Sequence, residues 1–204
     1  MLGTIILAGG KGNRIGGDKP LMKLGGRSLI SYVLEASSKV SDEAVVVVGG
    51  DGVKRFEALL PKDVKIVIDI VSGGGPLIGV YSGLRLLNSK YAAVLPCDSP
   101  FVHEGVLSYL ISKAEGADAV IPLWPNGYIE PLHSIYKVSA ALEASEATVE
   151  EGKFRIYNMI EKLEKVIYVP VEKLRKFDPD LLTFFNINSP EDFKKAEATL
   201  KLEP

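Results

Sequence analysis

A basic, glycine-rich loop directly after the first apolar run is the feature that most constrains this chain. The run Thr4–Leu7 is typical of a buried strand, and residues 7–21 read LAGGKGNRIGGDKPL. This stretch holds five glycines, two lysines and one arginine. Glycine lets backbone N–H groups approach a ligand closely, and successive N–H groups with nearby cations form a concave site for phosphate oxygens. We therefore predict a loop that binds the phosphates of a nucleotide.

Counting residues excludes two common phosphate loops. Gly12 and Gly17 have the spacing of the P-loop, but Asp18 stands where that motif needs lysine. The dinucleotide fingerprint G-x-G-x-x-G would need a glycine at Ile15, which argues against a nicotinamide-dependent oxidoreductase. The remaining pattern, L-A-G-G-x-x-x-R-x-G-x-x-K-P-L, resembles the loop of sugar-nucleotide-type nucleotidyltransferases, which wraps an incoming nucleoside triphosphate.

Length and composition narrow the class of protein. A chain of 204 residues predicts one domain, residues 1–204. Its net charge of −2 argues against a nucleic-acid partner, which normally requires a basic surface. The single cysteine, Cys97, predicts a reducing compartment and a space-filling role. No apolar run approaches the ~20 residues of a membrane span, and no signal peptide is recognisable. We therefore expect a cytoplasmic protein with no membrane partner.

Strand-like runs alternate with helix-length segments, as in βαβ units on a parallel sheet. The segment 124–136 reads as a turn and an extended return that adds an antiparallel strand. Strands are predicted at 4–8, 44–48, 64–68, 92–95, 119–123, 166–169 and 182–186. Helices are predicted at 28–37, 53–60, 76–87, 104–113, 139–145, 154–163 and 190–200.

Asp98 follows an apolar strand and lies between two prolines, Pro96 and Pro100. Ligands of open α/β sheets bind beyond the carboxyl ends of the strands. A carboxylate held there can bind Mg²⁺, which takes one or two carboxylates together with substrate phosphate oxygens. The alternative is that Asp98 only caps the following helix. We favour the metal role because the flanking prolines stiffen the position of the acid.

Two further positions lie at predicted ligand-binding ends. Gly75 opens a helix in the sequence Gly75–Gly79, GPLIG, and a helix N-terminus offers free N–H groups to phosphate. Asp69 ends the third strand and could accept hydrogen bonds from a guanine base or a ribose. A plain proline-led helix start and a solvated strand-end acid remain equal alternatives for these two positions.

Lys19 and Arg14 are the cations most strongly implicated by the loop. Lys19 precedes Pro20, so a stiff segment holds it, and its charge can neutralise a departing pyrophosphate. The forked guanidinium of Arg14 suits phosphate oxygens. We predict that Lys19, Arg14 and Asp98 carry the catalysis.

Weaker signals point to an acceptor substrate. These residues are polar side chains near the ends of later elements, namely Glu130, Lys153, Arg155, Asn186 and Asn188. If 182–186 is a strand, the two asparagines face the same side. His103, His133 and Trp124 are interpreted as structural.

An ordered set of motifs then points to one family. The blocks Leu7–Leu21, Gly75–Gly79, Pro96–Phe101, Glu130–Tyr136 and Asn186–Pro190 follow, with a few substitutions, the pattern of the molybdenum cofactor guanylyltransferases. The chain resembles these enzymes along nearly its whole length. The resemblance implies a Rossmann-like, three-layer α/β/α nucleotidyltransferase fold of the glycosyltransferase-A type with a mostly parallel sheet.

The resemblance also implies the reaction and its site. GMP passes from GTP to molybdopterin, pyrophosphate is released, and Mg²⁺ assists. Transient contacts with proteins that deliver or accept the cofactor are implied as well. The resemblance implies that Leu7, Ala8, Gly9, Lys19, Asp69 and Asp98 lie at the nucleotide, with Asp98 also on the metal. The loop and helix arguments above add Gly10, Gly12 and Gly75 to the expected nucleotide-binding residues.

Several alternatives stay open at this point. A glycine pair, Gly49–Gly50, replaces an asparagine that can touch the nucleotide in bacterial relatives, which leaves cytosine or adenine open beside guanine. The loop also resembles that of adenosylcobinamide-phosphate guanylyltransferases, which leaves another phosphorylated acceptor open. A regulatory module that binds GTP without turnover is the alternative from outside the enzymes.

Overall fold

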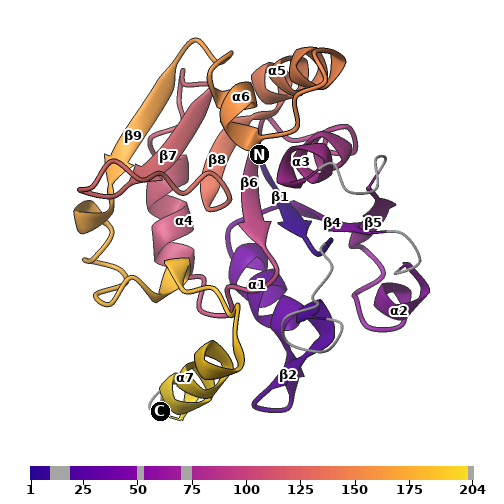
Figure 1. Cartoon of the computed structure of the whole chain (residues 1–204), viewed down its shortest axis with the longest axis vertical. Helices are drawn as coiled ribbons and strands as arrows, with labels where there is room; N and C mark the ends of the chain where they lie inside the picture. Colours follow the sequence, from indigo (N-terminus) through magenta and orange to yellow (C-terminus); the bar gives the residue numbers. More distant parts are fainter. Residues whose placement is uncertain (10–18, 50–52, 70–74, 202–204) are drawn as a thin grey trace.

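The computed structural model describes residues 1–9, 19–49, 53–69 and 75–201. Within these residues, the centre is a seven-stranded sheet with the order β5-β4-β1-β6-β8-β7-β9 (Figure 1). All neighbouring strands are parallel except in the two pairs that β8 makes. The strands are β1 (Leu2–Leu7), β4 (Glu43–Val48), β5 (Lys65–Ile68), β6 (Tyr91–Pro96), β7 (Ala119–Leu123), β8 (Ser134–Lys137) and β9 (Val166–Pro170). The predicted mostly parallel sheet with one antiparallel addition is confirmed.

Helices cover both faces of this sheet because its central strands are apolar on both sides. In β4, Val45 and Val47 belong to one core, whereas Val46 and Val48 belong to the other. The first core includes α3, α5 and α6, and the second includes α1, α2 and α4. The helices are α1 (Leu29–Ser38), α2 (Val53–Glu57), α3 (Pro76–Leu84), α4 (Glu104–Ile111), α5 (Val138–Glu150), α6 (Ile156–Ile160) and α7 (Pro190–Leu200). The three-layer α/β/α architecture is confirmed.

The path of the chain creates a switch point between β1 and β6. From β1 the chain moves outward to β4 and β5, then returns through α3 to β6 on the other side of β1. Ligands of such sheets bind at the carboxyl ends of the strands where this reversal occurs. The ends of β1 and β6 are therefore the expected binding edge.

The predicted strand at 182–186 is wrong. The structure has a 3₁₀ turn at Leu182–Phe184, preceded by Leu181 in a left-handed conformation with φ of 56°. The buried carboxylate of Asp178 accepts the backbone N–H groups of Leu182 and Thr183 at 3.0 and 2.7 Å. These bonds fold the apolar segment back on itself, so it packs as a turn.

A small hairpin and the last helix lie together beyond one end of the sheet, at the bottom of Figure 1. Strands β2 (Lys23–Leu24) and β3 (Arg27–Ser28) pair through Gly25 and Gly26, which have φ of 56° and 86°. Such positive values suit a tight hairpin turn. Helix α7 lies near β2 in Figure 1, and Leu24, Leu29, Ile187 and Ala196 are buried together between these elements. The segment before α7 therefore lies close to the hairpin that follows Lys19.

Among the described residues, no helix has the length and apolar character that crossing a bilayer requires.

Candidate active site

The ends of β1, β4 and β6 meet at one edge of the sheet. The backbone N–H of Cys97 donates to the carbonyl oxygen of Leu7 at 3.1 Å, and the N–H of Ala8 donates to that of Val47 at 2.8 Å. A Cβ placed on Gly9 would lie 3.4 Å from the backbone nitrogen of Gly49. The chain therefore leaves β1 pressed against the backbone that follows β4. Leu7, Ala8 and Gly9 lie at the switch point, whereas Gly10, Gly12 and Arg14 lie outside the described residues.

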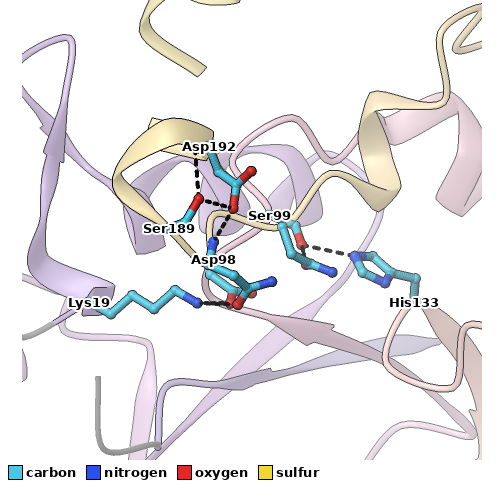
Figure 2. A network of polar contacts seen from close by, with 8 residues as sticks. Lys19, Asp98, Ser99, His133, Ser189 and Asp192 are labelled. Atoms are coloured by element: carbon cyan, nitrogen blue, oxygen red, sulfur yellow. Dashed lines mark hydrogen bonds and ion pairs between the residues drawn. The ribbon is translucent and has the colours of Figure 1, made fainter. Parts of the chain in front are cut away.

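Lys19 and Asp98 form an ion pair at this edge (Figure 2). Lys19 begins the 3₁₀ helix η1 (Lys19–Leu21), whose Pro20 is buried, so the lysine stem starts from a fixed backbone. The Nζ atom of Lys19 binds Oδ2 of Asp98 and also donates to Oδ1 of Asn188 at 2.9 Å. Both side chains of the ion pair are 17% exposed. A cation and an acid predicted from separate motifs are thus in direct contact, and a solvent-accessible part of each remains.

The helix-capping alternative for Asp98 is wrong. Helix α4 begins at Glu104, and its N-cap is His103, whose Nδ1 accepts the N–H of Gly105 at 3.0 Å. His103 is therefore structural, as predicted. Asp98 instead uses its backbone carbonyl to accept the N–H of Ile187 at 3.0 Å and its carboxylate to bind Lys19. Its carboxylate therefore takes part in the ion pair at the carboxyl ends of the strands and not in a helix cap.

A capping arrangement at the start of α7 holds Asn188. Ser189 is the N-cap, and its hydroxyl oxygen accepts the N–H of Asp192 at 3.1 Å. The Asp192 carboxylate in turn accepts from the Ser189 hydroxyl at 2.9 Å and from the Asn188 N–H at 3.1 Å. The Ser189 hydroxyl, followed by the Asn188 N–H, holds the pKa of Asp192 below its ordinary value. Figure 2 shows this cap directly above the Lys19–Asp98 pair.

Asn186 belongs to a second chain of polar contacts on the other side of Asp98. The hydroxyl of Ser99 donates to Oδ1 of Asn186, and Nε2 of His133 lies 3.0 Å from Ser99 Oγ. On the far side of the imidazole, Nδ1 lies 3.7 Å from Oε2 of Glu130. Oε1 of Glu130 accepts the indole N–H of Trp124 at 2.7 Å. Sequence reasoning placed Glu130 and Asn186 at the site but missed the two residues that link them.

Asp69 and Gly75 lie at the same edge, further along the sheet. The N–H of Asp69 donates to the carbonyl of Val48 at 2.8 Å, which places the half-buried acid at the end of β5. Gly75 precedes Pro76, the first residue of α3, and has φ of 74°. Because α3 leads from the end of β5 toward the start of β6, its N-terminus lies at the carboxyl edge. The proline-led helix start is confirmed, and it leaves α3 directed at the site.

The remaining acceptor candidates adjoin the start of α3. A Cβ on Gly75 would lie 3.4 Å from the carbonyl oxygen of Phe154, which stands between Lys153 and Arg155. Lys153 and Arg155 are exposed, and Lys153 pairs with Glu151 at 2.9 Å. Partial burial raises the pKa of Tyr157, and the nearby acidic groups of Tyr128 and Glu130 add to this effect. The contact between Gly75 and Phe154 therefore places Lys153 and Arg155 near the start of α3.

The polar groups that could bind a ligand at this edge are carboxylate and amide oxygen atoms and the ammonium nitrogen of Lys19. Within the described ranges there is no group of three His, Cys, Asp or Glu side chains that could hold a metal ion by itself. Carboxylate and amide oxygens do gather around Asp98, and oxygen ligands suit Mg²⁺. An edge where Lys19 meets the carboxylate of Asp98 and the amide of Asn188 can bind a polyanion and a divalent cation together.

The comparisons with known proteins agree on one family. Residues 4–166 match the model described as the MobA-like NTP transferase domain. A protein of Methanosarcina mazei named "Probable molybdenum cofactor guanylyltransferase" is 34% identical over 94% of this chain and 88% of its own length. A protein of Pyrococcus furiosus with the same name is 36% identical over 96% of each chain. The solved structure of molybdopterin-guanine dinucleotide biosynthesis protein A from Archaeoglobus fulgidus is 35% identical, with a TM-score of 0.82 over 98% of both chains.

Proposed function

Because this chain belongs to the MobA-like NTP transferase domain family, we propose that it is a nucleotidyltransferase that transfers GMP from GTP to the terminal phosphate of molybdopterin. The products are a guanine dinucleotide cofactor and pyrophosphate. The observation that carries this proposal is the contact of Lys19 with both Asp98 and Asn188 at the switch point of the sheet. Relatives named as molybdenum cofactor guanylyltransferases, at 34% and 36% identity over nearly the whole chain, support the choice of substrates.

The reaction requires positioning more than covalent chemistry. An oxygen of the acceptor phosphate forms a bond to the α-phosphorus of GTP, and the bond from that phosphorus to the β-phosphate bridging oxygen breaks in line. The acceptor phosphate is already ionised at neutral pH, so no general base is needed. Catalysis then comes from alignment and from neutralising charge on the departing pyrophosphate. Lys19 supplies that positive charge, together with Arg14 and the backbone N–H groups of Gly9, Gly10 and Gly12.

Asp98 is the residue proposed to hold Mg²⁺. The oxygen donors of this edge fit the ion, and the described residues hold no cluster of three potential metal ligands, which suits an ion that would take further ligands from phosphates and water. When bound, Mg²⁺ supplies Lewis acidity and orients the triphosphate. A carboxylate of Asp98 that held the ion would leave the Lys19 ammonium group to bind phosphate.

The base and the acceptor are assigned to different residues of the edge, and the two sets adjoin where Gly75 lies beside Phe154. Asp69 is proposed to accept hydrogen bonds from guanine or ribose, and the α3 N-terminus at Gly75 to bind the nucleotide. The acceptor lies on the side of Glu130, Lys153, Arg155, Asn186 and Asn188. Transient contacts with proteins that deliver or accept the cofactor are part of this proposal, and the cytoplasmic location stays a prediction.

A substrate matrix tests the proposal. The purified protein is incubated with Mg²⁺, each nucleoside triphosphate and either molybdopterin or adenosylcobinamide phosphate, and pyrophosphate and dinucleotide products are measured. We expect turnover only with GTP and molybdopterin. Turnover with CTP or with the cobinamide acceptor would replace the substrate assignment. Binding of GTP without pyrophosphate release in any mixture would identify a regulatory module instead.

A matched pair of variants connects this activity to the site. Asp98→Asn removes the carboxylate charge at the edge, whereas Asp63→Asn makes the same change at an exposed position before β5. We expect Asp98→Asn to lose Mg²⁺-dependent turnover and Asp63→Asn to keep it. Equal activity in the two variants would remove Asp98 from the mechanism.

A further inference from the structure

A buried histidine lies beside the site without a part in the chemistry above. His133 is 1% exposed, and its ring meets the edge of Phe184 with centroids 5.3 Å apart. Its Nε2 lies 3.0 Å from the hydroxyl oxygen of Ser99, which is fully buried and follows Asp98 directly. Figure 2 shows the imidazole pointing at Ser99 from the side of the molecule opposite Lys19. The contact therefore links a buried side chain to the residue that follows Asp98 in the candidate site.

The protons in this chain of contacts have one consistent order. A serine hydroxyl has a single proton to donate, and Ser99 donates it to Oδ1 of Asn186. The Ser99 oxygen can then only accept from His133, so Nε2 of His133 is the donor. With its oxygen held by Ser99, the Asn186 amide directs its two N–H donors away from Ser99.

Asn186 and Asn188 lie on either side of the Asp98–Ser99 pair. Asn188 contacts Lys19 through its oxygen, and Asn186 contacts Ser99 through its oxygen. The backbone bond from Ile187 to Asp98 fixes the residue between them. Asn186 is half-buried and Asn188 is exposed beside Lys19, and amide N–H donors near a lysine can bind an anionic oxygen.

We propose that His133 and Ser99 are positioning residues, which orient the Asn186 amide so that its N–H groups donate to the phosphate of the acceptor. This rests on the proposed function, in which Asn186 lies on the acceptor side. Glu130 lies on the far side of the ring, with its carboxylate 3.7 Å from Nδ1, and it accepts the indole N–H of Trp124. Neither His133 nor Ser99 touches the reacting atoms.

The first test separates the two substrates kinetically. Ser99→Ala and His133→Phe both break the chain, and phenylalanine keeps an aromatic ring against Phe184. We expect each variant to raise KM for molybdopterin about tenfold, the scale of one lost hydrogen bond to a charged group, with KM for GTP within about twofold of the wild type. Ser99→Thr keeps the hydroxyl and should restore most of the affinity. Equal rises in both KM values, or no rise in folded variants, would overturn the proposal.

A double-variant comparison tests whether the effect passes through Asn186. In a linear chain, adding His133→Phe to Ser99→Ala or to Asn186→Ala should change KM for molybdopterin no further. Independent, additive losses would show that His133 acts by another route. Thermal unfolding of each variant identifies any loss of fold, and Ser99→Ala, the smaller change, carries the test if His133→Phe does not fold.

A substrate-free measurement separates this proposal from the proposed function. The ¹⁵N signal of the Asn186 side-chain amide reports its hydrogen bonding in the free protein. We expect it to shift in Ser99→Ala and in His133→Phe but not in Asp63→Asn. An unchanged signal would overturn the relay even if the enzyme uses molybdopterin. A shifted signal in a protein inactive with molybdopterin would leave the orientation intact and remove only the acceptor.

Discussion

The backbone N–H of Ile187 donates to the carbonyl oxygen of Asp98 at 3.0 Å, and this bond joins the C-terminal part of the chain to the end of β6. Ile187 is fully buried against the hairpin that follows Lys19. The bond therefore fixes Asp98 relative to both Lys19 and Asn188. The site depends on three segments that are distant in sequence and are held together by the core below the sheet.

Replacing Lys19 should remove much of the charge that stabilises the departing pyrophosphate. Lys19→Met keeps most of the stem and loses the ammonium group, so we expect kcat/KM for GTP to fall by about 10²-fold, the scale of one preorganised electrostatic contact. Lys62→Met, at an exposed position, is the matched control. Steady-state pyrophosphate release measures both. A loss below about threefold in Lys19→Met would show that Arg14 and the loop suffice.

Replacing Asp98 with alanine should abolish metal-dependent turnover. The variant loses the proposed metal ligand and leaves Lys19 with only Asn188 as a described side-chain partner. We expect turnover to fall by more than ~10²-fold and excess Mg²⁺ not to restore it. Because Asp98 is partly exposed, the protein should remain folded, as circular dichroism can check. Near-wild-type rates would contradict the metal role.

Local patterns in the sequence were sufficient to predict the central fold and to single out Lys19 and Asp98, which the structure brings into contact. The β-branched run in β4 predicts a buried strand, and the glycines after β1 predict a phosphate-binding loop, from only a few consecutive residues each. Asp98 could be found for the same reason, because a strand and two prolines surround it. These motifs did not predict how close their residues would lie to one another in the folded protein. The contact between Lys19 and Asn188 spans 169 positions and exists only because α7 packs on the hairpin.

The sequence failed where a long-range contact outweighs a local pattern. The apolar residues at 182–184 alternate like a strand, but the buried Asp178 carboxylate binds their N–H groups and forms a turn. His133 gave no signal of its contact with Ser99, which lies 34 positions away. The capping residues Ser189 and Asp192 did carry a signal, because a serine followed three residues later by an acid is a helix-start pattern. Their link to Asn188 needed the structure.

The cap of α7 predicts a pH-dependent loss of stability. The pKa of Asp192 is lowered in the folded protein below its ordinary value of 3.8, chiefly by the Ser189 hydroxyl. Its contribution to stability is therefore fully present above that value and is lost as the pH falls through the lowered folded pKa. Ser189→Ala should destabilise the protein by about 1 kcal/mol at pH 7, as for other N-cap losses. It should also raise the pKa of Asp192.

Urea unfolding of the wild type and Ser189→Ala at pH 7 and pH 3 measures this dependence. We expect the difference in stability between the two proteins to be smaller at pH 3 than at pH 7, because pH 3 lies below the ordinary pKa of Asp192, where the contribution of its lowered pKa is being lost. Glu191→Gln, which leaves the Ser189–Asp192 pair intact, is the control. A constant difference across this range would mean that the cap does not depend on the charge of Asp192.

Gly75→Ala should damage both stability and nucleotide binding. Gly75 has φ of 74° and ψ of −177°, a region that is essentially restricted to glycine, and side chains there cost about 1–3 kcal/mol. A Cβ would lie 3.4 Å from the Phe154 carbonyl oxygen, which is an ordinary van der Waals contact, so the strain comes from the backbone. Because relief of this strain moves the N-terminus of α3, we expect KM for GTP to rise.

Gly116→Ala, with φ of 70° in the turn before β7 and only the flexible end of Lys165 nearby, is the matched control for backbone strain alone. Unfolding and steady-state kinetics on both variants separate the two effects. A similar loss of stability with a rise in KM only for Gly75→Ala would place the α3 N-terminus at the nucleotide, whereas unchanged KM in both would remove Gly75 from the site.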